Sequence, residues 1–248
     1  MKFSPKEIET LSNEFESATP QEIVAWAVEN FCPNLALSSS FQTQAVPLLH
    51  MVKERKPEMR IFFLDTGMHF WDTLFFREHL DQIWDLNIVD LRPDEKWRTL
   101  LRHFGSDLPD TDPNLCCYIR KVQPMQKAMA GLDAWITGIR RDQTENRAHA
   151  EILEYKRDGL LRIAPLLNWT GEDISNYISQ NNLPRHPMPN TRYPSLGCKP
   201  CTRAIQLGEN ERAGRWTGKG KTECGLHTEM FDKKEFTENG FKLNLGEN

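Results

Sequence analysis

The chain has 248 residues, with 31 Lys or Arg against 35 Asp or Glu, so its formal net charge is −4. This length fits one large α/β domain, or one domain with a small extension. Aromatic residues make up 10% of the chain, which argues against a wholly disordered protein, and the near-neutral charge excludes a generally basic, nucleic-acid-coating protein. No apolar run approaches the ~18 residues of a membrane span, and the first residues lack the apolar core of a signal peptide. We therefore expect a cytoplasmic protein that binds neither membrane nor nucleic acid.

The first part of the chain predicts two helices and then a parallel sheet. Ser4-Pro5 and Thr19-Pro20 are each followed by a Glu that completes a capping box, so both begin helices. Short apolar segments then alternate with helix-like stretches, which predicts an α/β fold with a parallel sheet flanked by helices. The expected strands are 35–38, 61–64, 86–89 and 134–137, followed by a hairpin of 152–155 and 161–164 turning at 157–159. We expect an α/β domain over residues 1–183 and a C-terminal segment, 184–248, rich in Pro, Gly, Lys and Arg.

Polar loops follow three of the predicted strands, at 38–43, 65–67 and 138–142. In open parallel sheets, ligands bind beyond the carboxyl ends of the strands, so these loops predict a binding site. Ser38, Ser39 and Ser40 lie at a strand-to-helix turn, where hydroxyl and backbone N–H groups favour an anion. The alternative is a serine-rich helix cap, since the loop lacks the ending of a Walker A motif.

Cationic residues near these loops predict an anionic ligand. Arg140, Arg141 and Arg147 suit bidentate binding of sulfate or phosphate. The alternative is a solvated helix face on which acidic neighbours pair with them. Lys121 follows Cys117 by four residues and would share a helix face with it, unless it is an ordinary surface lysine.

The six cysteines divide into three groups. In a reducing compartment they are unlikely to form three structural disulfides. The vicinal pair Cys116-Cys117 and the pair Cys198-x-x-Cys201 supply four soft ligands, which suit either zinc or an iron–sulfur cluster. Spacing alone leaves both open, together with four unrelated thiols. Cys32 is expected to be a buried bystander.

Cys224 has a different setting. It lies in a polar segment near Lys219, Lys221 and His227, which would lower the pKa of a thiol, while Glu223 would raise it. This mostly electropositive environment favours a reactive thiolate over a structural cysteine.

Together, these motifs resemble the assimilatory sulfonucleotide reductases, which act on adenylyl sulfate (APS) or phosphoadenylyl sulfate (PAPS). The resemblance runs in order from about residue 34 to residue 227. It departs at Gln42, where the family commonly has Gly or Ala, at Arg192 in place of Gly, and at 70–73. The matching segments are 38–41, 63–67, 116–124, 135–143, 165–170, 193–202, 214–216 and 223–227.

The resemblance implies an adenine-nucleotide α-hydrolase-like fold with a modified pyrophosphate loop at 38–43. It also implies a [4Fe-4S] cluster on Cys116, Cys117, Cys198 and Cys201. Cys224 would attack the sulfonate sulfur, and thioredoxin or glutaredoxin would release sulfite from the resulting thiosulfonate. The substrate-binding residues implied are Ser38, Ser39, Ser40, Phe41, Asp65, Thr66, Gly67, Lys121, Gly138, Arg140, Arg141, Arg147, Arg215 and His227.

Because both cysteine pairs usually accompany APS reductases, we expect APS as substrate, with PAPS or dual use as the alternative, and a homo-oligomeric protein. Two more distant hypotheses remain. An ATP-pyrophosphatase relative would share the fold, but the chain lacks the glycine-rich loop of that group. A non-enzymatic iron–sulfur redox sensor or zinc-stabilised binding module would show no nucleotide-dependent turnover.

Overall fold

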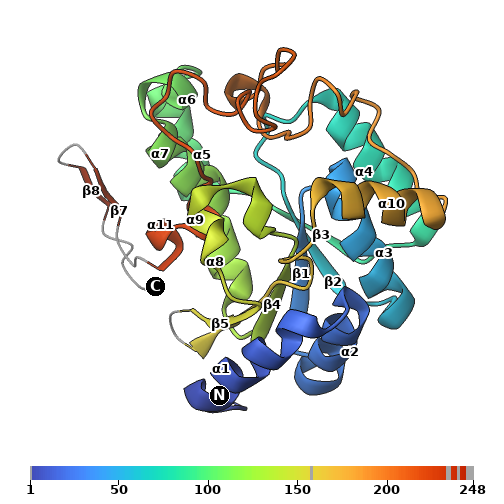
Figure 1. The fold of residues 1–248 in the computed structure, drawn as a ribbon. Helices are drawn as coiled ribbons and strands as arrows, with labels where there is room; N and C mark the ends of the chain where they lie inside the picture. Colours follow the sequence, from blue (N-terminus) through green and yellow to red (C-terminus); the bar gives the residue numbers. More distant parts are fainter. Residues whose placement is uncertain (1, 157–158, 233–235, 239–240, 244–248) are drawn as a thin grey trace.

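A six-stranded sheet forms the centre of the chain. The computed structural model describes residues 2–156, 159–232, 236–238 and 241–243, and within these ranges six strands form one sheet in the order β3-β2-β1-β4-β6-β5 (Figure 1). Neighbouring strands are parallel, except that β5 and β6 are antiparallel. The strands are β1 (Leu35–Ser39), β2 (Arg60–Leu64), β3 (Ile88–Leu91), β4 (Ala134–Thr137), β5 (Leu153–Tyr155) and β6 (Leu161–Ile163), with a separate antiparallel pair, β7 (Phe236–Glu238) and β8 (Phe241–Leu243).

Helices cover both faces of the sheet (Figure 1). The α-helices are α1 (Pro5–Glu14), α2 (Pro20–Phe31), α3 (Val46–Arg55), α4 (Trp71–Trp84), α5 (Glu95–Phe104), α6 (Leu108–Thr111), α7 (Pro113–Cys117), α8 (Gln123–Met129), α9 (Glu145–Ala148), α10 (Gly171–Gln180) and α11 (Glu229–Asp232). A π-helical turn, η3 (Tyr118–Val122), joins α7 to α8. Further 3₁₀ turns are η1 (Phe15–Ser17), η2 (Thr43–Ala45), η4 (Arg141–Gln143), η6 (Lys199–Cys201) and η7 (Gly225–His227).

Alternation along the strands gives the sheet two apolar faces. Leu37 of β1 and Ile136 of β4 pack into a core with residues of α1, α2, α3 and α10. Their sequence neighbours Ala36 and Trp135 point to the opposite face and pack with residues of α5, η3 and α8. Because consecutive side chains of a strand point to opposite faces, a sheet buried on both sides requires continuous apolar runs, such as 35–37 in β1 and 134–136 in β4.

The predicted α/β fold is confirmed. Capping boxes begin α1 and α2 as predicted, and another, at Thr170, begins α10. The third strand begins two residues later than expected, at Ile88, and the predicted hairpin is the antiparallel pair β5 and β6. Residues 157–158 of its turn lie outside the described residues. The division at residue 183 stays a prediction.

The segment that follows α10, residues 181–216, crosses the carboxyl ends of the parallel strands (the orange loops of Figure 1). We call it the crossing segment. A main-chain contact holds it there: the Lys199 N–H donates to the Met68 carbonyl (2.7 Å). Within the segment, two stretches of chain cross where the Arg203 N–H donates to the Gly214 carbonyl (2.9 Å). A β-carbon on Gly214 would lie 2.3 Å from the Arg203 carbonyl oxygen, so this crossing requires glycine. The segment thereby covers the edge of the sheet from which the polar loops emerge.

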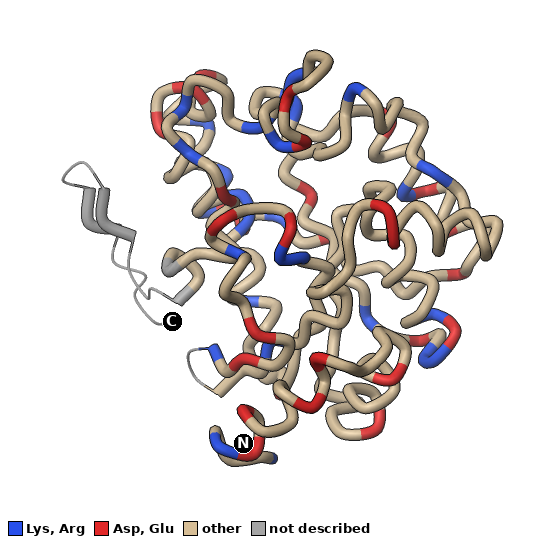
Figure 2. Tube along the Cα trace, in the orientation of Figure 1, with Lys and Arg blue, Asp and Glu red and all other residues tan. Residues whose placement is uncertain are grey.

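The charged residues follow no single-sign pattern. Figure 2 shows acidic and basic residues interspersed along the described chain. Within the same residues, no helix combines the length and apolar character that crossing a bilayer requires.

Candidate active site

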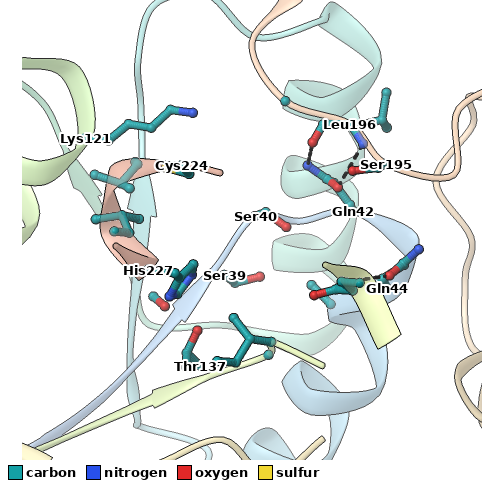
Figure 3. Close-up of a pocket in the computed structure, with 18 of the residues that line it drawn as sticks. Ser39, Ser40, Gln42, Gln44, Lys121, Thr137, Ser195, Leu196, Cys224 and His227 are labelled. Carbon is teal, nitrogen blue, oxygen red and sulfur yellow. Dashed lines mark hydrogen bonds between the residues drawn. The ribbon is translucent and has the colours of Figure 1, made fainter. Parts of the chain in front are cut away.

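A pocket opens at the carboxyl ends of β1, β2 and β4, beneath the crossing segment. In Figure 3, Lys121 and Cys224 lie on one side of it, and Gln42, Ser195 and Leu196 lie on the other. The polar and sulfur-bearing residues of its lining include Ser38, Ser39, Ser40, Gln42, Gln44, Thr66, His69, Lys121, Thr137, Gln143, Arg147, Ser195, Cys198, Arg212, Arg215, Cys224 and His227. The pocket therefore joins the predicted strand-end loops to the predicted nucleophile.

The loop after β1 turns sharply at Phe41. This residue has a φ of 51°, and its buried ring packs edge-to-face on Phe63 with ring centroids 5.5 Å apart. Its N–H donates to the Ser39 hydroxyl (3.1 Å), and the Trp135 indole N–H donates to the Ser38 hydroxyl (2.8 Å). Ser40 is exposed at the tip of the turn. Phe41 is thus an anchor that shapes the loop, and it is not among the residues lining the pocket.

Two glutamines connect this loop to the crossing segment. The Gln42 amide donates to the Leu196 carbonyl (2.7 Å) and accepts from the Leu196 N–H (3.2 Å). The Gln44 amide donates to the Pro194 carbonyl (2.8 Å). The Gly or Ala common at position 42 in the family cannot make the paired contact that Gln42 makes.

Cys224 approaches the pocket from the C-terminal segment. It is half-buried and packs against the cluster formed by Cys198, Cys201 and Trp216. The next residue, Gly225, is buried so closely that a β-carbon there would lie 2.4 Å from Met230 Sδ and 2.9 Å from Val122 Cγ2. Close packing on η3 therefore fixes where the segment places its thiol.

Four cations line the same pocket: Lys121, Arg147, Arg212 and Arg215. Arg215 donates to the Leu196 carbonyl (2.5 Å) and lies over the Trp216 ring, 4.3 Å from its centroid. The buried Nε atoms of Arg147, Arg212 and Arg215 have no hydrogen-bond partner among the described residues. Unused buried donors around a polar pocket are suited to an anionic ligand.

A second, smaller cavity adjoins the pocket and contains the other four candidate thiols. Cys116, Cys117, Cys198 and Cys201 line it together with Arg120 and Lys121. Lys121 and Cys198 line both spaces. Among the described residues, no group of three or more His, Cys, Asp or Glu side chains is already arranged to hold a metal ion.

The π-helical turn η3 presents cations to both spaces. It follows Cys117 directly and contains Arg120 and Lys121. Single π-helical turns inside helices often occur at functional sites. Cys117, at the end of α7, and Lys121, in the π-helical turn, line one cavity. Arg120 donates to the Thr66 carbonyl (2.6 Å), which ties the loop after β2 to the cysteine cavity.

The thiols and cations of this region shift one another's pKa values. Burial opposes the charged form of Lys121, but the Cys198, Cys224 and Cys117 thiolates outweigh it and raise the pKa of the ammonium group. Burial likewise opposes the Cys198 thiolate, but Lys121 and the Thr66 hydroxyl, 3.3 Å from the sulfur, lower the pKa of that thiol. The region therefore favours a lysine cation beside a thiolate.

Several predicted binding residues do not line the pocket. Arg141 donates to Glu16, Asn168 and the Ala150 carbonyl, and so joins η4 to η1 near the N-terminus. Arg140 is buried against Asp142 and Gln44, and supports the glutamine that holds the crossing segment.

Two predicted binding residues in the loop after β2 also have partners elsewhere in the protein. Asp65 pairs with Arg92 (2.6 Å) and accepts from the Gly67 N–H (3.0 Å), so these two residues shape the loop and do not line the pocket. Thr66 and, after β4, Gly138 do line it.

His227 lies deep at the base of the pocket, beside Ser39 and Thr137 (Figure 3). Its ring stacks on Trp135, with centroids 5.8 Å apart and planes 10° apart. Burial, aided by the positive charge of Arg147, holds the pKa of this imidazole well below its usual value. The ring is therefore neutral near pH 7, and its buried Nδ1 has no hydrogen-bond partner among the described residues.

The sequence did not identify Gln44, Arg212 or Glu223 as site residues. Arg212 lies three residues before Arg215, a spacing that would have been a usable signal. The lysines expected to act on Cys224 have other partners: Lys219 binds the Pro109 carbonyl (3.0 Å), and Lys221 binds the Asn114 side chain (2.6 Å). Their effect is to attach the segment to α6 and α7.

The fold and pocket define an α/β protein whose strand-end pocket carries four cations next to a set of thiols. Residues 34–204 match the model of the phosphoadenosine phosphosulfate reductase domain, which shows that the chain belongs to this family. It is 38% identical to an adenosine 5'-phosphosulfate reductase of Streptomyces coelicolor over 220 residues, covering 88% of this chain and 92% of that protein. The enzyme of the same name from Salinibacter ruber is 35% identical over 233 residues, covering 93% and 92%.

Solved structures agree with the family. The phosphoadenylyl-sulfate reductase of Candida auris, in a phosphate complex, is 25% identical, with a TM-score of 0.71 over 83% of this chain and 99% of that one. An FMN adenylyltransferase of Candida glabrata, at 14% identity and a TM-score of 0.53, covers 79% and 73% of the two chains and shares the fold only. The expected nucleotide α-hydrolase-like fold is thus confirmed.

The paired contact of Gln42 yields a prediction. Gln42→Ala removes two hydrogen bonds to Leu196, each worth about 0.5–1.5 kcal/mol. We expect faster amide exchange in the peptide that contains Leu196, measured by hydrogen exchange and mass spectrometry. Gln82→Ala, at an exposed position of α4, is the control that leaves this exchange unchanged. Equal protection in the two variants would show that the contact does not hold the segment.

Proposed function

We propose that this chain catalyses the thiol-dependent reduction of adenylyl sulfate to sulfite and AMP in sulfate assimilation, with Cys224 as the nucleophile. One observation carries the proposal: Cys224 lies in the pocket that also presents the β1 loop and four cationic side chains. The membership of the chain in a sulfonucleotide reductase family and its relatives' names support the same reaction.

In the first step, the Cys224 thiolate attacks the sulfonate sulfur of the substrate. A bond forms between the cysteine Sγ and that sulfur, and the bond from sulfur to the bridging phosphate oxygen breaks. AMP leaves with the electron pair, and Cys224 retains the SO₃ group as a thiosulfonate. A thiolate is a suitable nucleophile because it is soft and strongly reactive toward sulfur.

The cations of the pocket address the difficulty of this step, in which one anion approaches another. Lys121, Arg147, Arg212 and Arg215 offer positive charge to the sulfonate and phosphate groups and to the negative charge that develops on the leaving oxygen. The β1 loop, with Ser39 and Ser40, offers hydroxyl and main-chain donors to the nucleotide.

The second step requires two thiols from a separate reductant, for which we propose thioredoxin or glutaredoxin. One reductant thiolate attacks Cys224 Sγ and releases sulfite, forming a mixed disulfide. The second reductant thiol then displaces Cys224 and leaves the reductant as a disulfide. Two thiols thereby supply the two electrons that convert sulfur(VI) to sulfur(IV), and Cys224 returns to its thiol form.

We further propose that Cys116, Cys117, Cys198 and Cys201 hold a [4Fe-4S] cluster. The residues fit this group because four thiols line one cavity, and the Thr66 hydroxyl and the Lys219 ammonium lie 3.3 and 3.7 Å from two of the sulfurs. Such outer contacts tune metal-bound thiolates. When bound, the cluster supplies a fixed charge centre beside Lys121 and need not change its redox state.

The choice of adenylyl sulfate over its 3'-phosphorylated form depends on the family resemblance, in which both cysteine pairs usually accompany APS reductases. Arg192, one of the departures from the family pattern, is exposed and does not line the pocket. Reduction of phosphoadenylyl sulfate, alone or in addition, is the alternative.

The reaction is tested by sulfite release under anaerobic conditions with thioredoxin, comparing the two nucleotides at equal concentration. We expect turnover with adenylyl sulfate as the preferred substrate. Cys224→Ser removes the thiolate and is expected to abolish turnover while leaving AMP binding intact; the control, Cys32→Ser, lies outside the pocket and should retain activity. Retained turnover in Cys224→Ser would exclude the nucleophile, and a strong preference for the phosphorylated nucleotide would overturn the substrate.

The cluster is tested by iron analysis and visible absorbance of protein purified without oxygen. The wild type should hold about four iron atoms per chain, and Cys201→Ser should lose most of them because one of four ligands is gone. Cys32→Ser again provides a matched cysteine substitution that leaves the iron content unchanged. Full iron content in Cys201→Ser would contradict the assignment of this ligand.

A further inference from the structure

Glu223, immediately before Cys224, is almost completely buried beside the pocket, with 3% of its surface exposed. A buried carboxylate next to the nucleophile of an anion-attacking reaction needs an explanation, since its charge opposes both the thiolate and the substrate. We propose that Glu223 is a positioning residue that fixes the main chain of Cys224 in the pocket. This inference depends on the proposed role of Cys224 as nucleophile.

The contacts of Glu223 come from three directions. One oxygen, Oε2, accepts from Arg147 Nη2 (2.7 Å) and from the N–H of Cys224 (3.2 Å), and lies 3.6 Å from Arg212 Nη2. The other oxygen, Oε1, accepts from the Thr144 hydroxyl (2.8 Å). The carboxylate therefore attaches the chain at Cys224 to α9 and its cap, which follow β4, and to the crossing segment.

The charges of this cluster are balanced within it. Burial alone would raise the pKa of Glu223, but Arg147, Arg212 and the Thr144 hydroxyl hold it below its usual value. Breaking a buried ion pair by removing one partner is costly, because the other charge is then left uncompensated. The ion pair of Glu223 with Arg147 thus opposes any movement of Cys224 out of the pocket.

Because of these contacts, a substitution of Glu223 should affect catalysis and the binding of an anion differently. Arg147 and Arg212 line the pocket, and each has a buried Nε without a partner among the described residues. Glu223→Gln keeps the size of the side chain but removes its charge. The two guanidinium groups are then less neutralised and remain available to an anion, whereas the main chain at Cys224 loses its charged acceptor.

We therefore expect Glu223→Gln to lower the rate of thiosulfonate formation by ~tenfold or more, the effect of losing one hydrogen bond to a charged group. Binding of AMP, measured by calorimetry, should be unchanged or tighter. A general disordering of the site would weaken both. The matched control is Glu209→Gln, which removes the carboxylate of another ion pair in the crossing segment, with Arg203 at 2.7 Å and outside the pocket lining. It should change neither quantity.

A measurement independent of turnover completes the test. Purified protein is treated with iodoacetamide, and alkylation of Cys224 is followed by peptide mass spectrometry. We expect Cys224 to react faster in Glu223→Gln than in the wild type and in Glu209→Gln, because the half-buried thiol is no longer held against Trp216. Unchanged alkylation, or parallel loss of thiosulfonate formation and AMP binding, would overturn the inference. If the wild type itself forms no thiosulfonate, it is the proposed function that fails, and the alkylation rates still decide the position of Cys224.

Discussion

The free-energy cost of removing positive charge from water determines which groups surround this pocket. Lys121, Arg147, Arg212 and Arg215 line one pocket, and a cation removed from water needs a counter-charge or a full set of acceptors. The chain supplies these partners from distant segments: thiols from the cysteine cavity, the Glu223 carboxylate, and the Leu196 carbonyl. The compensation is incomplete, since the Nε atoms of the pocket arginines Arg147, Arg212 and Arg215 have no hydrogen-bond partner among the described residues. Together with the four cations, these donors suit the anionic ligand that we propose.

The segment after α10 gives this arrangement its geometry. It passes over the carboxyl ends of the strands, where Gln42 holds Leu196 and Met68 holds Lys199. Its glycines allow close approach: a β-carbon on Gly197 would lie 2.3 Å from Arg215 Nη2. The β1 loop, the cysteine cavity and the thiol of Cys224 are consequently parts of one packed unit. Lys121 and Cys198 line both the pocket and the cysteine cavity, and so connect the two.

The sequence predicted most of the fold, because its signals are local. Capping boxes marked the first two helices, and apolar segments marked the strands within two residues. The residues that line the pocket were harder to predict from the sequence. Arg140, Arg141 and Arg147 look alike in sequence, but only Arg147 lines the pocket, because tertiary partners such as Glu16 and Gln44 engage the other two. The roles of Gln42 and Glu223 depend on residues more than 70 positions away, and no local pattern encodes such contacts.

The central claim is that Cys224 itself receives the sulfonate group. The most direct measurement is intact-protein and peptide mass spectrometry after incubation with adenylyl sulfate in the absence of any reductant. We expect one added SO₃ group per chain, located on the peptide that contains Cys224 and released as sulfite when thioredoxin is added. An SO₃ group on another residue, or sulfite release on adding thioredoxin without any prior adduct, would contradict it.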